Sequence, residues 1–273
     1  MVGPSIPPHI LRRLSRIEPG AQFRGVLPQV FSSSGKVYYA KTGSPSDRGA
    51  YTTEAESLKA LNLAAPGLVP KLLAFGFADE NGRETDGGSS SRASPFFITE
   101  YKDMSSLTEH SGAILGRRLA TEVHNYASPK GFGSEVVPYY GGATRLRNGW
   151  YKTWEKYVDA LIADLLATLE ARGGFSDLCR KGQDVRARQV SLGVSLCECG
   201  LILSRERVVP ALLRPLRIKP VLLHGGLWVC HLARMENFLL MMMVQSGNAG
   251  TDVATGEPVM FDASCVYGHN EAE

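Results

Sequence analysis

The sequence contains no hydrophobic run long enough to cross a membrane. The longest such run, residues 238–244, falls far short of the roughly 20 apolar residues that span a bilayer. Residues 1–20 also lack a long apolar stretch followed by small residues, which argues against a secretory signal. We therefore predict a cytoplasmic protein that makes no membrane contact.

A strong charge of either sign is also missing. The 30 basic and 27 acidic side chains among 273 residues leave a net charge of only +3. Binding to nucleic acid or to an anionic membrane surface depends on a larger excess of basic residues. We therefore predict that the partner is a small molecule or another soluble protein, and not nucleic acid.

Cysteine is scarce, and its spacing does not suggest a site. The chain has 5 cysteines, an odd number, without a CxxC pair. Small disulfide frameworks and zinc sites normally show even numbers or paired spacings. We interpret these residues as reduced thiols of a cytosolic protein: Cys179, Cys197, Cys199, Cys230 and Cys265.

Hydrophobic residues make up 44% of the chain, which is enough to fill a substantial core.

In the first part of the sequence, residues 35–42 and 96–101 are rich in β-formers and read as strands. Residues 51–63 repeat apolar side chains at helical intervals, and residues 67–78 read as a strand after a turn. The polar, Gly/Ser-rich residues 79–94 predict a solvated loop.

The second part of the sequence is predominantly helical in character. Residues 114–127 and 150–171 carry apolar side chains at three- and four-residue spacing. Trp150 and Trp154 lie four residues apart, so we expect them to pack on one face of the second of these helices.

The strand-rich first part and the helical second part predict an α+β fold with two lobes. Residues 1–103 would form a small mixed lobe with a β-sheet and one key helix, and residues 104–273 a mainly helical lobe. This is the layout of a protein-kinase-like fold.

Residues suited to phosphoryl transfer occur in a matching order. ATP chemistry needs a cation on the phosphates, a carboxylate that holds this cation, and oxygen ligands for Mg²⁺. Lys41 ends one predicted strand and Glu54 lies in the next helix, where an ion pair would form, although such residues are often only surface charges. Asp262 follows an apolar strand and suits Mg²⁺.

Residues 98–103 would connect the lobes, and the backbone of Thr99, Glu100 and Tyr101 would meet adenine, although an edge strand explains this segment equally well. The predicted ATP-binding residues are Gly35, Lys41, Glu54, Thr99, Glu100 and Tyr101.

Several stretches together resemble the fructosamine kinase family, the ketosamine-3-kinases. They are "YAK", "EAESLKAL", "GFG" with "NGWYKTW", "PVLLHGGLW", "SGNAG" and "GEPVMFDASCVYGHNEAE", from about Val30 onward. The resemblance implies a fold similar to that of aminoglycoside phosphotransferases. It also implies ATP- and Mg²⁺-dependent phosphorylation of the sugar 3-hydroxyl on glycated lysines of proteins or on free ketosamines, ribulosamines included, so that the adduct is shed in protein deglycation.

One loop departs from the family pattern HGD-L-W-x-G-N, in which the Asp accepts a proton and the Asn binds the metal. Gly226 stands where this Asp belongs, after His224, which we expect to brace the loop. The resemblance implies Asn248 and Asp262 as the metal ligands, yet Asn248 follows Gly226 only after 22 positions.

Removing residues 229–245 restores the family spacing of five. We hypothesise that this segment is a translated, in-frame intron. The codons of Val229–Cys230 begin with GT, which suits the first bases of an intron, and Gln245 can be encoded by CAG, which suits its last bases. A genuine lineage-specific loop is the alternative. The chain also stops at "GHNEAE", where the family continues, so we expect the second lobe to be incomplete.

The main interpretation is therefore a protein-ribulosamine 3-kinase whose activity is impaired in this chain. A non-catalytic pseudokinase that binds nucleotide or glycated protein is the first alternative, and a small-molecule phosphotransferase the second. The sequence leaves open the sugar adduct, the target protein and the oligomeric state.

Overall fold

The computed structural model describes residues 6–85, 91–140, 144–146, 148–187, 213, 216–227 and 247–273. The chain forms two compact units, one made of Met1–Asn125, His224–Cys265 and Glu273, the other of Tyr126–Leu223 and Val266–Ala272. The hypothesised insert lies outside the described residues. Within the described part of the chain, no helix has the length and apolar character of a membrane span.

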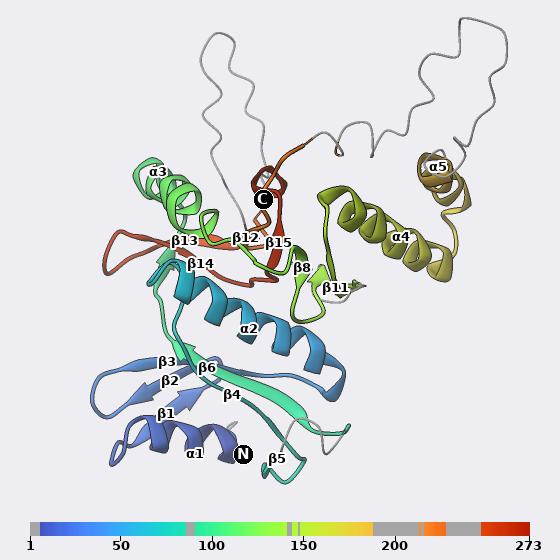
Figure 1. The fold of residues 1–273 in the computed structure, drawn as a ribbon. Coiled ribbons are helices and arrows are strands. Elements are labelled where there is room, and N and C mark those ends of the chain that lie inside the picture. The colour runs from blue at the N-terminus through green and yellow to red at the C-terminus, as the bar shows by residue number, and fades with distance from the viewer. Residues whose placement is uncertain are drawn as a thin grey trace, which may run out of the picture. The chain divides into compact units, whose positions relative to one another are not determined.

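The first unit contains an antiparallel sheet with the strand order β1-β2-β3-β6-β4-β5 (Figure 1). The strands expected within residues 35–42, 67–78 and 96–101 are confirmed as β3, β4 and β6. Strands β1 and β2 were not predicted, and β5 lies within residues 79–94, where a loop was expected. The bounds are β1 (Phe23–Val26), β2 (Gln29–Ser32), β3 (Val37–Thr42), β4 (Leu72–Ala78), β5 (Glu84–Thr85) and β6 (Ser94–Glu100).

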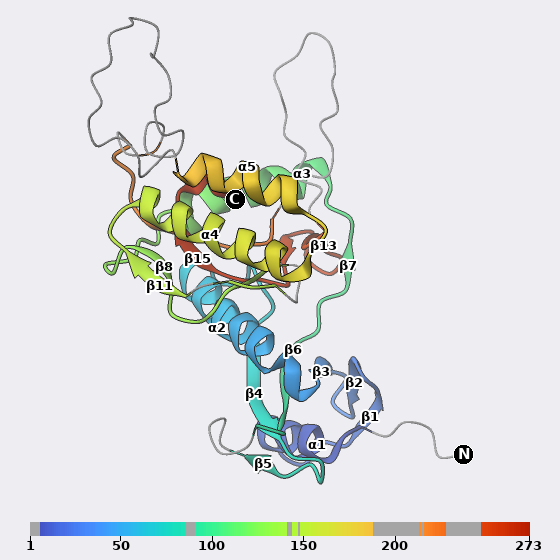
Figure 2. The ribbon, with the colours of Figure 1, turned by 90° about the vertical axis from the view of Figure 1, so that its right-hand side faces the viewer.

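Two helices cover opposite faces of this sheet because β6 is apolar on both sides. Phe96 and Ile98 belong to a buried cluster with Ile10 and Leu14 of α1 (Pro8–Ile17). The ring of Phe97, which points the other way, contacts Tyr51 of α2 (Arg48–Ala64) at a centroid distance of 5.6 Å. In Figure 2 the strands β4 and β6 run side by side between these two helices. This packing fixes the position of α2 on the sheet, and with it the position of Glu54.

A three-stranded sheet and a helix complete the first unit. The order is β14-β13-β7, and the turn between β13 and β14 is closed by a hydrogen bond from the Gly256 amide to the Asp252 carbonyl. The expected helix at 114–127 is present in two parts, with an N-cap at Thr108. The elements are β7 (Met104–Ser105), α3 (Glu109–Arg118), the π-helical η2 (Leu119–Val123), β13 (Ala249–Asp252) and β14 (Pro258–Met260), preceded in the chain by the short η1 (Pro45–Asp47).

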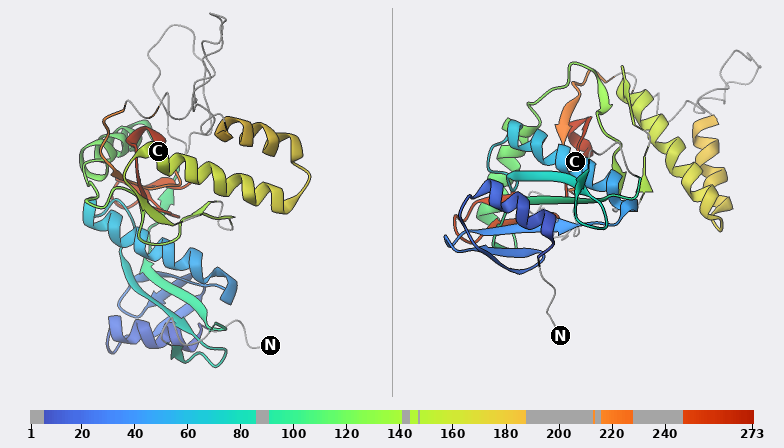
Figure 3. Two further views of the ribbon diagram at one scale, coloured as in Figure 1. Left: turned by 45° about the vertical axis from the view of Figure 1, so that its right-hand side comes forward. Right: turned by 90° about the horizontal axis from the view of Figure 1, so that it is seen from below.

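The second unit combines small sheets with two helices. Its larger sheet has the order β11-β8-β15-β12, and β9 pairs with β10. Helices α4 and α5 lie side by side (Figure 3). The elements are β8 (Phe132–Ser134), β9 (Tyr139–Tyr140), β10 (Thr144–Arg145), β11 (Gly149–Tyr151), α4 (Trp154–Arg172), α5 (Ser176–Ala187), β12 (Val221–Leu223), β15 (Val266–Gly268) and η3 (Asn270–Ala272).

The expectation that Trp150 and Trp154 share a helical face was wrong. Trp150 lies in β11, and α4 begins only at Trp154, because the side chain of Thr153 caps the helix by accepting a hydrogen bond from the amide of Lys156. The two indoles still pack, but against different partners: Trp150 contacts the ring of Tyr267, whereas Trp154 is stacked on Tyr157 of its own helix.

Candidate functional site

The first unit encloses a cavity of about 440 Å³, a volume typical of small-molecule sites. Its walls come from the sheet, from α2, from the residues that follow β6 and from the residues that follow β14. They are Pro28, Gln29, Tyr39, Glu54, Leu58, Pro70, Phe97, Thr99, Glu100, Tyr101, Lys102, Asp103, Met104, Phe261 and Asp262. Five predicted site residues therefore meet around one cavity: Glu54, Thr99, Glu100, Tyr101 and Asp262.

The expected ion pair between β3 and α2 is present. The Lys41 Nζ atom lies 2.8 Å from Glu54 Oε2, and it also lies over the ring of Phe97 at 4.6 Å from the centroid. Burial lowers the pKa of Lys41, but the nearby Glu54 carboxylate, helped by Asp262, outweighs burial and keeps this pKa above its ordinary value. Lys41 is thus a cation held against two residues of the cavity wall, Glu54 and Phe97, although Lys41 is not itself among the described residues that line the cavity.

The segment 99–101 is tightly bonded into the sheet. Thr99 is buried, and the amides of Glu100 and Tyr101 donate to the carbonyls of Lys71 (3.1 Å) and Val37 (3.4 Å). A backbone contact from Glu100 or Tyr101 to a ligand would therefore use the carbonyl group and not the amide.

Lys102, Asp103 and Met104 also line the cavity. Lys102 and Asp103 belong to the connector expected from the sequence but were given no role in the site there, and Met104 was not predicted. Gly35 lies in the turn between β2 and β3 with a φ of +89°, a conformation that favours glycine, and it is not among the described residues that line the cavity.

Gly226, Asn248 and Asp262 converge at one point. The Asn248 side chain donates from Nδ2 to the Gly226 carbonyl at 3.0 Å, and the Phe261 amide donates to the Asn248 carbonyl. A Cβ atom at residue 226 would lie 3.0 Å from Asn248 Nδ2 and 3.3 Å from the Asp262 carbonyl oxygen. Because the φ of Gly226 is not in the left-handed region, a side chain here would need only small shifts of its neighbours.

His224 is part of the support of this loop. It is fully buried, and its amide and that of Gly225 both donate to the carboxylate of Glu273, at 2.8 and 3.2 Å. Burial lowers the pKa of His224, with the Glu273 carboxylate opposing the shift. Glu273 also lies 3.5 Å from Nε2 of His124. The role of Glu273 was missed because no local pattern marks a contact across 49 residues.

The donor chemistry of Asn248 and Asp262 fits Mg²⁺. This ion prefers oxygen ligands and is usually held by one or two carboxylates together with substrate phosphates and water. Within the described ranges, no cluster of three or more His, Cys, Asp or Glu residues could hold a metal without such help. Asn248 and Asp262 therefore suit a metal that binds together with a phosphorylated ligand better than a structural metal held by the protein alone.

Comparisons with known proteins agree with these features. The family model described as fructosamine kinase matches residues 27–273. The chain is 31% identical over 188 residues to the chloroplastic protein-ribulosamine 3-kinase of Oryza sativa subsp. japonica, which covers 68% of this chain and 43% of that protein. It is likewise 31% identical over 180 residues to the protein of the same name from Arabidopsis thaliana, covering 65% and 43%. The chain thus spans less than half the length of these curated relatives.

A solved structure supports the fold. The chain is similar to the putative fructosamine-3-kinase from Haemophilus somnus 129PT with a TM-score of 0.61 at 17% identity, covering 96% of this chain and 73% of that one. The α+β, kinase-like fold predicted from the sequence is therefore confirmed.

Proposed function

Because the chain belongs to the fructosamine kinase family, we propose that its first unit binds ATP and that its architecture is that of a protein-ribulosamine 3-kinase. The reaction would transfer the γ-phosphoryl group of ATP to the sugar 3-hydroxyl of a ketosamine, on a glycated lysine of a protein or on a free ketosamine. The observation that carries the proposal is the 2.8 Å ion pair of Lys41 with Glu54 at a cavity that also gathers the segment 99–101 and Asp262.

Each group has a defined task in this proposal. Lys41, held in place by Glu54, would contact the phosphates, and the carbonyls of the segment 99–101 would orient the adenine. Asn248 and Asp262 would hold Mg²⁺, which neutralises charge on the phosphate oxygens when it is bound. His224 and Gly225, anchored by Glu273, would fix the loop that presents residue 226 to the acceptor hydroxyl.

Gly226 favours a second candidate function, nucleotide binding without transfer. A glycine cannot accept the proton of the sugar hydroxyl or orient it, and general-base catalysis is worth typically about 10²–10⁴-fold. The chain would then act through its bound nucleotide or through a glycated protein.

The cytosolic compartment expected from the sequence stays a prediction, and the names of the two plant relatives place those proteins in the chloroplast.

Restoring the missing carboxylate tests the proposal. We expect Gly226→Asp to raise phosphoryl transfer from ATP to a synthetic ribulosamine by about 10²-fold or more, measured as ADP release that requires the acceptor. The φ of residue 226 and the 3.0 Å or greater spacing around its Cβ position allow the new side chain.

Gly112→Asp is the matched control, because a Cβ atom at Gly112 meets no atom within 4 Å. It adds the same charge on α3 and should leave transfer unchanged. A Gly226→Asp protein that folds and binds ATP but gains no acceptor-dependent transfer would favour the non-catalytic function.

A further inference from the structure

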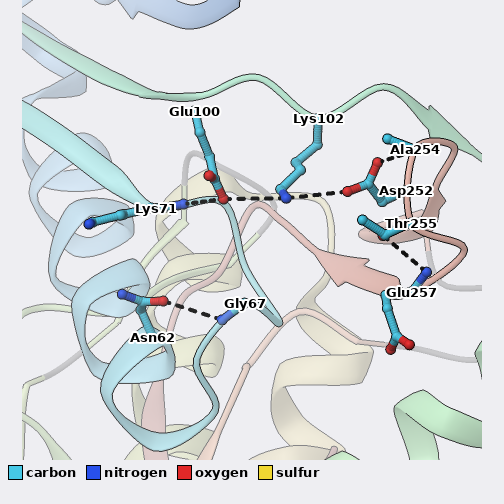
Figure 4. Close-up of polar contacts among 9 residues, drawn as sticks. All are labelled: Asn62, Gly67, Lys71, Glu100, Lys102, Asp252, Ala254, Thr255 and Glu257. Atoms are coloured by element: carbon cyan, nitrogen blue, oxygen red, sulfur yellow. Dashed lines mark hydrogen bonds and ion pairs between the residues drawn. The ribbon is translucent and has the colours of Figure 1, made fainter.

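Lys102 lies between two carboxylates at the wall of the cavity. Its Nζ atom is 3.2 Å from Asp252 Oδ2 and 3.5 Å from Glu100 Oε1 (Figure 4). The Glu100 carboxylate also accepts from the Lys71 amide at 3.1 Å, and Asp252 accepts from the Ala254 amide at 3.0 Å. A continuous series of polar contacts thus runs from the start of β4, through Lys102, to the hairpin of β13 and β14.

This hairpin carries both proposed metal ligands at its other end. Asn248 directly precedes β13, and Asp262 follows β14 after one residue. Ala249 pairs with Met260, and the Phe261 amide bonds the Asn248 carbonyl, so the ligand-bearing ends of the two strands are held together. Asp252 closes the opposite end of β13, where Lys102 contacts it.

The segment that lines the cavity joins the same sheet. Strand β7 follows this segment and pairs with β13, with Asp252 opposite Met104. The Val253 amide donates to the Asp103 carbonyl at 2.8 Å. Since β7 has only two residues, its backbone pairing is short. Hydrogen bonds from Ser105 Oγ to the Thr251 carbonyl and from Thr251 Oγ1 to the Ser106 carbonyl reinforce it, and the Lys102 contacts add an ionic link at Asp252.

The environment of Asp252 strengthens the ion pair. Its side chain is only 6% exposed and that of Lys102 is 22% exposed, so the pair is less screened than a surface ion pair. Burial opposes the ionisation of Asp252, but the hydrogen bonds from Ala254 and Lys102 outweigh burial and lower the pKa of this carboxyl. Removing the ammonium would leave two carboxylates near each other without their shared cation.

We propose that Lys102 is a positioning residue that couples the adenine-side segment, residues 99–103, to the hairpin that carries Asn248 and Asp262. Through this contact, nucleotide binding and Mg²⁺ binding reinforce each other. The inference rests on the proposed function for the identity of the two ligands, and on the contacts of Lys102 for the coupling.

Two measurements on the full chain test the coupling. We expect Lys102→Gln to speed amide hydrogen exchange across residues 249–262 in the protein without nucleotide. We also expect Mg²⁺ to improve ADP affinity in the parent protein by a factor in the range of about 5–150 that is usual for coupled sites, and this factor to fall at least about threefold in Lys102→Gln. Lys102→Arg, which keeps the cation, should restore most of the slow exchange and most of the gain in ADP affinity that Mg²⁺ gives.

Lys59→Gln is the matched control. Lys59 pairs with Glu56 at 2.7 Å on the exposed face of α2, so its loss should change neither measurement. Unchanged exchange in Lys102→Gln would overturn the contact as a link. Faster exchange with an unchanged Mg²⁺ effect would overturn the positioning role and leave a stabilising one. A parent protein that binds no nucleotide would overturn the proposed function, while the exchange data would still decide whether Lys102 holds the hairpin.

Discussion

Asp262 adopts a backbone conformation that is costly for a residue with a side chain. Its φ is +54°, and within the described part of the chain no other non-glycine residue has a positive φ. Asp and Asn tolerate this left-handed region better than most residues, and strained positions of this kind are concentrated at functional sites. Together with its place on the cavity wall, this conformation points to the Asp262 side chain as a binding group.

Two substitutions separate the charge of Asp262 from its backbone conformation. Asp262→Asn should keep the fold within about 1 kcal/mol, because Asn also tolerates the left-handed region, yet it should weaken the Mg²⁺-dependent part of nucleotide affinity. Asp262→Ala should weaken it equally and cost a further 1–2 kcal/mol or so of unfolding free energy, since alanine lacks that tolerance. Titrations with and without Mg²⁺, together with denaturant unfolding, provide the measurement. Equal Mg²⁺ dependence in all three proteins would contradict a metal-binding role.

Helix α1 is the element that supports the cavity from behind. Its residues Ile10 and Leu14 are fully buried against the sheet that carries Lys41. Three further contacts hold it: Arg13 pairs with Glu84 at 2.6 Å, Arg12 donates to the Gly82 carbonyl, and Tyr38 on β3 donates to Glu18, just after the helix, at 2.9 Å.

We expect Leu14→Ala to lower the free energy of unfolding by about 2–5 kcal/mol, because it removes buried side-chain volume and leaves a cavity under the sheet. Denaturant unfolding measures the loss. Leu63→Ala is the control, since Leu63 is 68% exposed on α2 and its replacement should change little. Equal effects of the two substitutions would show that α1 does not form part of the core.

The elements show where reading the sequence succeeds and where it fails. Strands β3, β4 and β6 were predictable because they are short runs of β-forming and apolar residues, and helix α2 was predictable because its apolar residues recur at helical intervals. Helix α1 was missed although Ile10, Leu14 and Ile17 follow a helical spacing after Pro7 and Pro8, which was the available signal. Trp150 was misassigned because its apolar spacing continued that of α4, and the capping residue Thr153 was the stronger boundary signal.

At the scale of the whole molecule, the residues of the site come from distant parts of the chain. The pair of Lys41 with Glu54 could be predicted because both ends lie on neighbouring, recognisable elements. The contact of Lys102 with Asp252 spans 150 residues and depends on how β7 meets β13, which no local pattern encodes. The same holds for Glu273 under the loop of His224. Charge and spacing thus predict the candidate ligands, whereas the groups that hold them in place require the structure.

The titratable groups predict a loss of stability toward acid pH. The pKa of His9 is lowered by burial and by the nearby Arg12, and that of His224 by burial. Both groups therefore bind fewer protons in the folded state, and stability falls as the pH drops below about 6.5. Glu18, with a pKa lowered to about 2 chiefly by a hydrogen bond from Ser34, adds a further loss below about 4.5. Burial raises the pKa of Glu54, with Lys41 opposing the shift, so this group acts in the opposite sense.

Melting temperatures recorded between pH 7 and pH 4 check this sign. We expect His9→Gln to flatten the decline between about pH 6.5 and 5, because the variant has one fewer histidine to protonate on unfolding. His110→Gln, at an exposed position on α3, should keep the slope of the parent protein. A slope that is the same in all three proteins would show that His9 does not contribute.

The central claim is that the cavity beside Lys41 binds ATP, and a calorimetric titration of Mg·ATP into the parent protein, Lys41→Met and Lys59→Met tests it most directly. We expect the parent protein and Lys59→Met to bind alike. Lys41→Met should lose about 1.5–3 kcal/mol of charge-assisted contact, a weakening of about 10- to 150-fold. Equal binding by all three proteins, or no binding by the parent protein, would contradict the claim.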